Sequence, residues 1–125
     1  MEWILKQSFN RGQQAEKLAL DFLQRQGLRL LTKNYAWRGG ELDLVMSDKD
    51  TIVFVEVRQR SSTRFGSAQE SLNSKKCTRL INCAQHYLQN KKLLHRPCRF
   101  DVMAANGKVE GDDMHFEWIK NAITL

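Results

Sequence analysis

The chain has 125 residues and a formal net charge of +6, from 20 Lys and Arg against 14 Asp and Glu. Hydrophobic residues make up 42% and charged residues 27%, which argues against a disordered chain. No apolar run reaches the ~20 residues that cross a bilayer, and the N-terminus lacks a signal peptide's apolar region. The three cysteines (Cys77, Cys83, Cys98) form no disulfide framework. We therefore expect a single domain over residues 1–125, in the cytoplasm, with reduced thiols.

The first predicted element is a helix over residues 11–26. Its apolar residues fall on one stripe at helical spacing: Ala15, Leu18, Ala19, Phe22 and Leu23. Gly27 suits the C-terminal end of this helix, because glycine adopts the left-handed conformation that often follows a helix. A strand is predicted over residues 28–35, and Gly39-Gly40 then interrupts the chain.

Two strands are predicted next, over residues 41–47 and 51–58. In the first, alternation predicts Leu42, Leu44 and Met46 on one face and Glu41, Asp43 and Val45 on the other. The second is rich in β-branched residues and apolar on both faces until Glu56, which is typical of a buried central strand.

The remaining chain predicts a loop, a helix and two strands. The loop covers residues 59–73, the helix 74–90, and the strands 99–105 and 116–119. The predicted order is therefore α-β-β-β-α-β-β, and an α/β fold follows, with a mixed β-sheet flanked by helices.

Two carboxylates stand where a charge is costly. Asp43 lies inside an apolar strand, and Glu56 lies near the end of the most hydrophobic strand. If Ser47 pairs with Asp50 across a two-residue turn, Asp43 faces Phe54, and Glu56 is its diagonal neighbour at ~7–8 Å. Two carboxylates at that distance repel unless a cation lies between them, and Mg²⁺ or Mn²⁺ suits such a pair.

Further residues extend this acidic pair. Arg58 follows Glu56 on the same strand face, where it could stabilise charge on a phosphate or form a simple ion pair with Glu56. Glu16 borders the apolar stripe of the first helix and is either an additional ligand or a solvated residue. Glu41 is an alternative to Glu16, and the pattern does not choose between them.

Cations surround the acidic residues in the sequence. Arg38 leads into the Asp43 strand, Arg60 and Arg64 follow the Glu56 strand, and Lys75 and Lys76 begin the second helix. Such side chains make phosphate contacts, so we expect these five to bind nucleic acid. The alternative is a set of solvated loop charges. Trp37 could stack on a base, but a tryptophan in a small domain more often lies in the core or at its rim, and His86 has no partner spacing that suggests catalysis; neither is assigned a role.

Five ordered sequence blocks cover nearly the whole chain. They are RGQQAE at 11–16, GELDLV at 40–45, FVEVR at 54–58, RFDV at 99–102 and EWIKNA at 117–122. Together they resemble the YraN-like family of uncharacterised bacterial proteins. That family is similar to archaeal Holliday junction resolvases, so the resemblance implies the restriction-endonuclease-like fold and a version of the PD-(D/E)-x-K nuclease motif.

The resemblance also implies roles by position. Asp43 would be the motif aspartate, Glu56 the E-x-K acid, and Glu16 the first-helix glutamate that resolvases add to the metal site. Arg58 stands at the lysine position, and this is a departure. Lysine can release a proton and activate water, whereas arginine stays protonated and can only hold a phosphate oxygen.

Residues and resemblance together predict a Mg²⁺- or Mn²⁺-dependent endonuclease that cuts DNA. Branched, Holliday-junction-like DNA is the candidate substrate, and the resemblance makes a homodimer plausible. The first alternative is a non-catalytic nucleic-acid-binding module with a degenerate nuclease site. The second is a structural or protein-partner role, in which the acidic side chains form internal ion pairs.

Overall fold

A computed structural model describes residues 11–60, 73–106 and 115–123, without the side chains of Arg11 and Arg60. The elements in chain order are α2 (Arg11–Arg25), β1 (Arg29–Trp37), β2 (Gly40–Asp48), β3 (Thr51–Arg60), α3 (Ser74–Asn90), β4 (Cys98–Asn106) and β5 (His115–Ile123). This order confirms the predicted α-β-β-β-α-β-β arrangement. The last strand is longer than the predicted 116–119, and no helix within the described ranges is long and apolar enough to cross a membrane.

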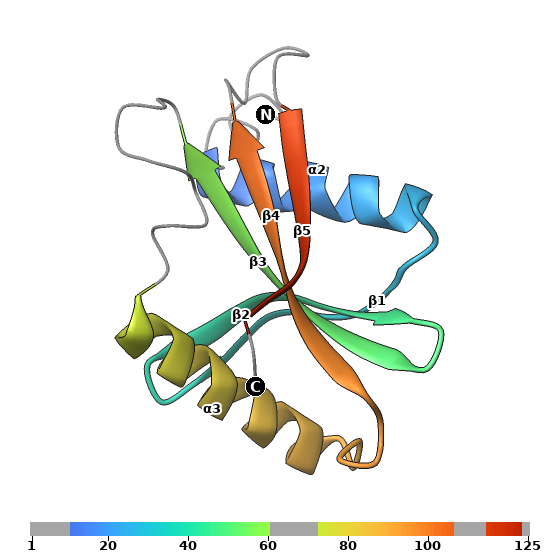
Figure 1. The fold of residues 1–125 in the computed structure, drawn as a ribbon, viewed down its shortest axis with the longest axis vertical. Coiled ribbons are helices and arrows are strands. Elements are labelled where there is room, and N and C mark those ends of the chain that lie inside the picture. The colour runs from blue at the N-terminus through green and yellow to red at the C-terminus, as the bar shows by residue number, and fades with distance from the viewer. Residues whose placement is uncertain (1–10, 61–72, 107–114, 124–125) are drawn as a thin grey trace, which may run out of the picture.

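The five strands form one mixed sheet in the order β1-β2-β3-β4-β5. Neighbouring strands are antiparallel except β3 and β4, which are parallel. A parallel pair needs a long crossover connection, and α3 lies within this one. Figure 1 shows the twisted sheet with α2 and α3 on either side of it.

The helices cover opposite faces of the sheet. Leu23 of α2 packs in a cluster with Val53 and Met103, whereas Leu80 of α3 packs with Phe54 and Phe100. Adjacent residues of β3 alternate between the two clusters, which explains why the strand is apolar on both faces. β3 is therefore the central strand that the sequence predicted, and its residues 52–56 are buried.

Special backbone conformations position the ends of these elements. Gly27 has φ 97°, and the Leu28 amide donates to the Leu23 carbonyl at 3.1 Å, which ends α2. Arg38 and Gly39 have φ 44° and 79° and join β1 to β2 in a two-residue turn. Asn73 caps α3, because its Oδ1 accepts from the Lys76 amide at 2.9 Å.

The predicted shared face of Leu42, Leu44 and Met46 is wrong. Leu42 packs in the α3 cluster, whereas Leu44 and Met46 pack in the α2 cluster. The two leucines flank Asp43, which lies just beyond the end of the β2–β3 pairing at Leu44 and opposite Asn34 of β1, whose φ is 53°. Twist is larger where a strand has fewer neighbours, so the alternation of side chains breaks at this point of β2.

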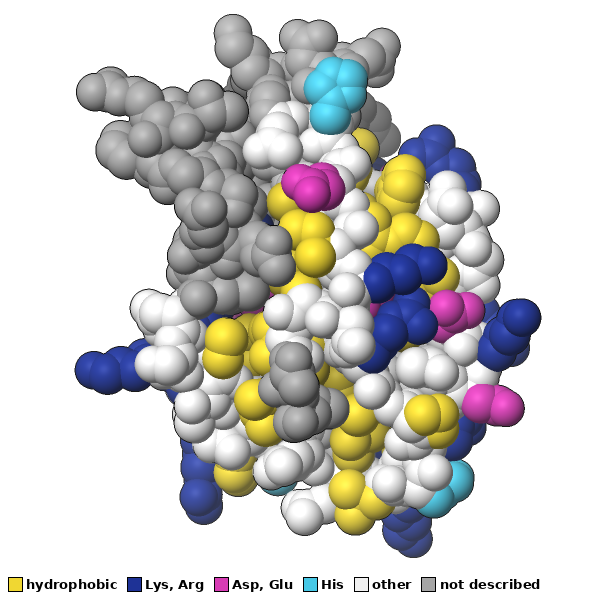
Figure 2. Space-filling view, in the orientation of Figure 1, with side chains coloured by type: hydrophobic (Ala, Val, Ile, Leu, Met, Phe, Trp, Pro, Cys, Tyr) yellow, Lys and Arg dark blue, Asp and Glu magenta, His cyan; other side chains and the backbone are white. Residues whose placement is uncertain are grey.

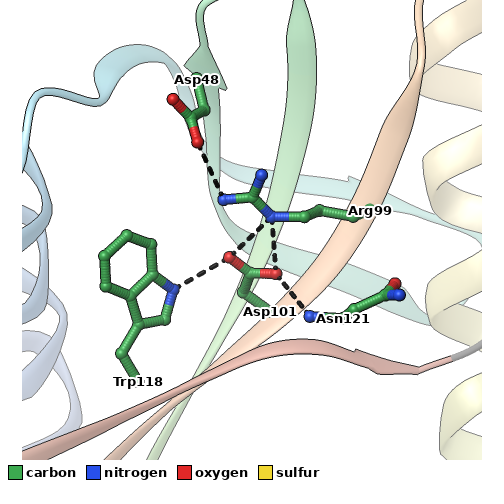
Figure 3. Close-up of polar contacts among 5 residues, drawn as sticks. All are labelled: Asp48, Arg99, Asp101, Trp118 and Asn121. Carbon is green, nitrogen blue, oxygen red and sulfur yellow. Dashed lines mark hydrogen bonds and ion pairs between the residues drawn. The ribbon is translucent and has the colours of Figure 1, made fainter.

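A buried charge network joins β4, β5 and β2 (Figure 3). Asp101 is fully buried and accepts from Arg99 Nε at 3.1 and 3.2 Å, Trp118 Nε1 at 2.9 Å and the Asn121 amide at 2.9 Å. Arg99 also pairs with Asp48 at 3.2 Å. The network lies at the register shift between Phe100 and Val102, so Asp101 satisfies the backbone of a locally irregular β5.

The surface carries the basic surplus of the sequence. Figure 2 shows Lys and Arg side chains projecting from several margins of the face in view. Hydrophobic side chains lie between them, and Leu94 is the most exposed large one in the described chain, at 62%. Isolated apolar residues on a surface are normal.

Candidate functional site: a carboxyl pair where two strands separate

The candidate site lies where β2 and β3 separate. Their pairing ends at Leu44 and Val55, while β2 stays paired with β1 and β3 stays paired with β4. Figure 1 shows these two strands running apart beyond that point. The Val57 amide therefore has no β2 carbonyl opposite it and donates to Asp43 Oδ2 at 2.8 Å. The separation opens room for side chains between two strands of one sheet.

The register of the hairpin differs from the expected one by two residues. Asp48 pairs with Thr51, so the predicted pairing of Ser47 with Asp50 is wrong. A two-residue shift keeps each side chain on its face. Asp43 thereby comes level with Glu56 rather than diagonal to it, and the two carboxyl groups are close enough to share a hydrogen bond.

Both carboxyl groups are harder to ionise than in water. Burial, followed by the charge of Glu56, raises the pKa of Asp43 to about 7. Burial also raises the pKa of Glu56, although Lys76 and Arg58 act in the opposite direction. Near neutral pH the pair therefore retains a proton unless another cation compensates its charge.

Two basic side chains approach Glu56 without satisfying it. Lys76 Nζ lies 3.6 Å and Arg58 Nε 3.9 Å from Glu56 Oε1, whose side chain is only 6% exposed. Both distances exceed a good hydrogen bond. Among the residues that the structure describes, Glu56 Oε2 and Arg58 Nε are buried and have no hydrogen-bond partner. Buried carboxylate oxygens normally accept a hydrogen bond, so this oxygen is an acceptor without a donor in the described part of the chain.

Asn34 holds two further carboxylates beside the pair. Its Nδ2 donates to Glu16 Oε1 at 2.8 Å and to Glu41 Oε1 at 3.1 Å. Burial raises the pKa of Glu16, and the charges of Asp43 and Glu41 add to this rise. The two alternatives left open by the sequence therefore lie together, and one amide links them.

These side chains line an open cavity of about 330 Å³, which we call the acid pocket. It is bounded by Glu16, Gly39, Gly40, Glu41, Asp43, Glu56, Lys76, Arg79 and Leu80. Gly40 is required for its shape, since a Cβ there would lie 2.7 Å from the Arg79 carbonyl oxygen. The turn after β1 can therefore pack directly against α3.

The donor set fits a hard divalent cation bound mainly by the Asp43–Glu56 pair. Within the described residues, no group of three or more His, Cys, Asp or Glu side chains is arranged to hold a metal ion. Mg²⁺ commonly uses one or two carboxylates and completes its shell with water and substrate phosphate oxygens. The lack of a described donor to Glu56 Oε2 and the raised pKa of Asp43 are what such a cation would relieve.

The predicted phosphate-binding cations divide into three groups. Lys76 points into the acid pocket, whereas Lys75 is exposed at the start of α3. Arg38 is exposed, and its guanidinium lies 4.7 Å over the Trp37 ring. The Arg60 side chain and Arg64 lie outside the described residues.

Comparison with known proteins identifies the family. The model of "Uncharacterised protein family UPF0102" matches residues 15–105. A UPF0102 protein of Nitrosomonas europaea is 50% identical over 113 residues, covering 90% of this chain and 92% of that protein. Relatives from Pseudomonas syringae pv. syringae (89% and 90% covered) and Nitrosococcus oceani (93% of each) are 49% and 45% identical. The family predicted from the five sequence blocks is thus confirmed, and the chain belongs to UPF0102.

Proposed function

We propose that this protein is a metal-dependent endonuclease that hydrolyses phosphodiester bonds in DNA. We propose further that its mixed sheet and two helices form a restriction-endonuclease-like fold. One observation carries the proposal: half-buried Asp43 and buried Glu56 form a carboxyl pair at a cavity edged by cations, and one oxygen of Glu56 has no hydrogen-bond partner among the described residues. Such a pair lowers the stability of the folded protein, and a feature that is kept at the expense of stability points to a function.

In this proposal Asp43 and Glu56 hold Mg²⁺ or Mn²⁺. A bound divalent cation would make a water molecule more acidic and offset charge on the scissile phosphate. The Val57 amide fixes Asp43 through its 2.8 Å hydrogen bond. Asn34 restrains Glu16 and Glu41, which keeps these carboxylates at the pocket wall.

In the proposal, Arg58 and Lys76 together take the two roles of the lysine in the nuclease motif, which are to contact the phosphate and to orient the water. Arg58 stays protonated and is suited to hold a phosphate oxygen by two hydrogen bonds. Lys76 Nζ lies 3.6 Å from Glu56 Oε1 and lines the acid pocket, where its ammonium group can donate hydrogen bonds. Lys76 therefore orients the attacking water in the proposal, although it lies on α3 and not two residues after Glu56.

The test is a cleavage assay on duplex, flapped, single-stranded and four-way-junction DNA, with Mg²⁺, Mn²⁺ or EDTA. We expect metal-dependent cutting, and Asp43→Asn should reduce it by about 10²-fold or more, because Asn is a poor ligand for a hard cation. Asp21→Asn, an exposed aspartate of α2, is the matched control and should cut normally. Cutting that persists in EDTA or in Asp43→Asn would refute the proposal.

The second candidate is a nucleic-acid-binding module that does not cut. The Lys76–Glu56 ion pair favours it, because an ammonium group already lies where a metal would bind. Arg58 at the motif position favours it too, since arginine cannot serve as a base. The same panel separates the two: this candidate predicts salt-sensitive binding and intact DNA under every metal condition.

A further inference from the structure

A second cavity lies beside the acid pocket and has different chemistry. It measures about 260 Å³ and lies between the end of β1 and one side of α3; we call it the Trp37–His86 groove. Arg38 and Trp37 form its strand side, and Arg79, Asn82, Gln85 and His86 form its helix side. None of the described residues that line it carries a carboxylate.

Stacked planar groups give the groove a rigid wall. The Trp37 and His86 rings lie 4.4 Å apart at an interplanar angle of 13°, and the Arg38 guanidinium carbon lies 4.7 Å from the Trp37 ring centre. A hydrogen bond of 2.6 Å between His86 Nδ1 and the Tyr35 hydroxyl fixes the orientation of the His86 ring. Because His86 and Arg38 already stack on the Trp37 ring, the exposed guanidinium plane of Arg38 is the part of the stack on which a base or sugar can pack.

The groove adjoins the acid pocket. Arg79 lines both cavities, and the turn that carries Arg38 continues directly into Gly39 and Gly40 of the acid pocket. A phosphate at the carboxyl pair would therefore have its neighbouring nucleotide within reach of the groove. The two arginines suit that nucleotide's own phosphate, and the amides of Asn82 and Gln85 offer donors and acceptors to a base edge.

We infer that the Trp37–His86 groove binds one nucleotide of the strand that is cut, immediately next to the scissile phosphate. This inference rests on the proposed function for its substrate, and adds where that strand lies on the protein. An acidic peptide would satisfy the two arginines and the amides, but its acidic side chains have no aromatic ring to pack against the planar groups. The observations therefore favour a nucleotide.

The test is binding of a fluorescently labelled single-stranded oligodeoxynucleotide in EDTA, measured by anisotropy at low salt. Arg38→Gly removes the guanidinium, and glycine suits the φ of 44° at this position, so the fold is retained. Lys49→Gly is the matched control, with the same charge loss at a turn residue of φ 56°. Lys49 follows the end of β2 opposite to the end near Arg38. At about 3.3 Å per residue, the length of β2 places the two side chains roughly 25–30 Å apart.

We expect Arg38→Gly to weaken binding about five- to tenfold and Lys49→Gly less than about twofold. Gln85→Ala should weaken it too, whereas Gln24→Ala, an exposed glutamine of α2, should not. An oligonucleotide of abasic sites should bind the unsubstituted protein more weakly than a normal one, because it offers no base to stack.

Three results would overturn the inference: equal losses in Arg38→Gly and Lys49→Gly, unchanged binding of the abasic strand, or equal competition by polyglutamate. The last two would identify a general polyanion surface. EDTA prevents metal-dependent cutting, so the outcome does not depend on whether the protein is an enzyme. Failure of the cleavage assay with a positive result here would refute the nuclease and leave the groove as a nucleotide-binding site with no scissile phosphate beside it.

Discussion

Asp43→Asn should stabilise the protein at pH 8 by about 2 kcal/mol, measured in EDTA by urea unfolding. The pKa of Asp43 is about 7 in the folded protein against an ordinary value of 3.8. The folded state therefore holds a proton that the unfolded chain loses, and stability falls as pH rises from about 4 through 7. Asparagine stays neutral and can still accept from the Val57 amide, so it removes this cost.

The gain should shrink as pH falls from about 7 and vanish below about pH 4, where Asp43 is protonated in both the folded and the unfolded state. Glu56→Gln should act in the same direction, because burial raises the pKa of Glu56 as well. Asp21→Asn is the control and should change the free energy of unfolding by less than about 0.5 kcal/mol at either pH. An Asp43→Asn protein less stable than the unsubstituted protein at pH 8 would show that the carboxyl pair is not under electrostatic strain.

The opposite effect on stability is expected at Asp101, which is fully buried. Asp101→Ala should destabilise the protein by about 3–5 kcal/mol, because it leaves Arg99 without its buried partner and strands the Trp118 Nε1 and Asn121 amide donors. Asp101→Asn should lose less, since its oxygen can still accept. Denaturant unfolding at pH 7 measures both.

Asp48→Asn is the control for this network. Asp48 contacts the same Arg99, but its side chain is 35% exposed, so its loss should cost less than about 1 kcal/mol. Equal destabilisation by Asp48→Asn and Asp101→Ala would contradict the assignment of Asp101 as the centre of the network. Replacing aspartate by asparagine should therefore stabilise the protein at Asp43 and destabilise it at Asp101.

The order of helices and strands could be predicted from the sequence because its apolar residues recur at clear helical or strand spacings. The first helix has a clean apolar stripe, and β3 is apolar on both faces because helices cover both sides. Asp43 and Glu56 were identified for a related reason, since a charge inside such strands is costly. The hairpin register was two residues off, because Asp48-Lys49-Asp50 offers several plausible turns and Lys49 adopts an unfavourable positive φ.

Contacts that depend on three elements at once could not be predicted. Asn34 reads as an ordinary strand residue, yet its positive φ aims its amide at Glu16 and Glu41, from α2 and β2. Lys76 was expected to bind phosphate, and its contact with Glu56 depends on how α3 packs on the sheet. Arg99, Asp101, Trp118 and Asn121 stand in two of the recognised sequence blocks, but only the folded sheet brings those blocks together.

The most direct test is isothermal titration of Mn²⁺ into the unsubstituted protein, Asp43→Asn, Glu56→Gln and the exposed-site control Glu117→Gln at pH 8. We predict one Mn²⁺ per chain, binding weakened about tenfold or more in the Asp43 and Glu56 variants, and no change in Glu117→Gln. Affinity should fall at pH 6, because protons compete for the same carboxyl groups. Absence of binding to the unsubstituted protein at millimolar Mn²⁺, or equal binding to all four proteins, would contradict a cation site at the carboxyl pair.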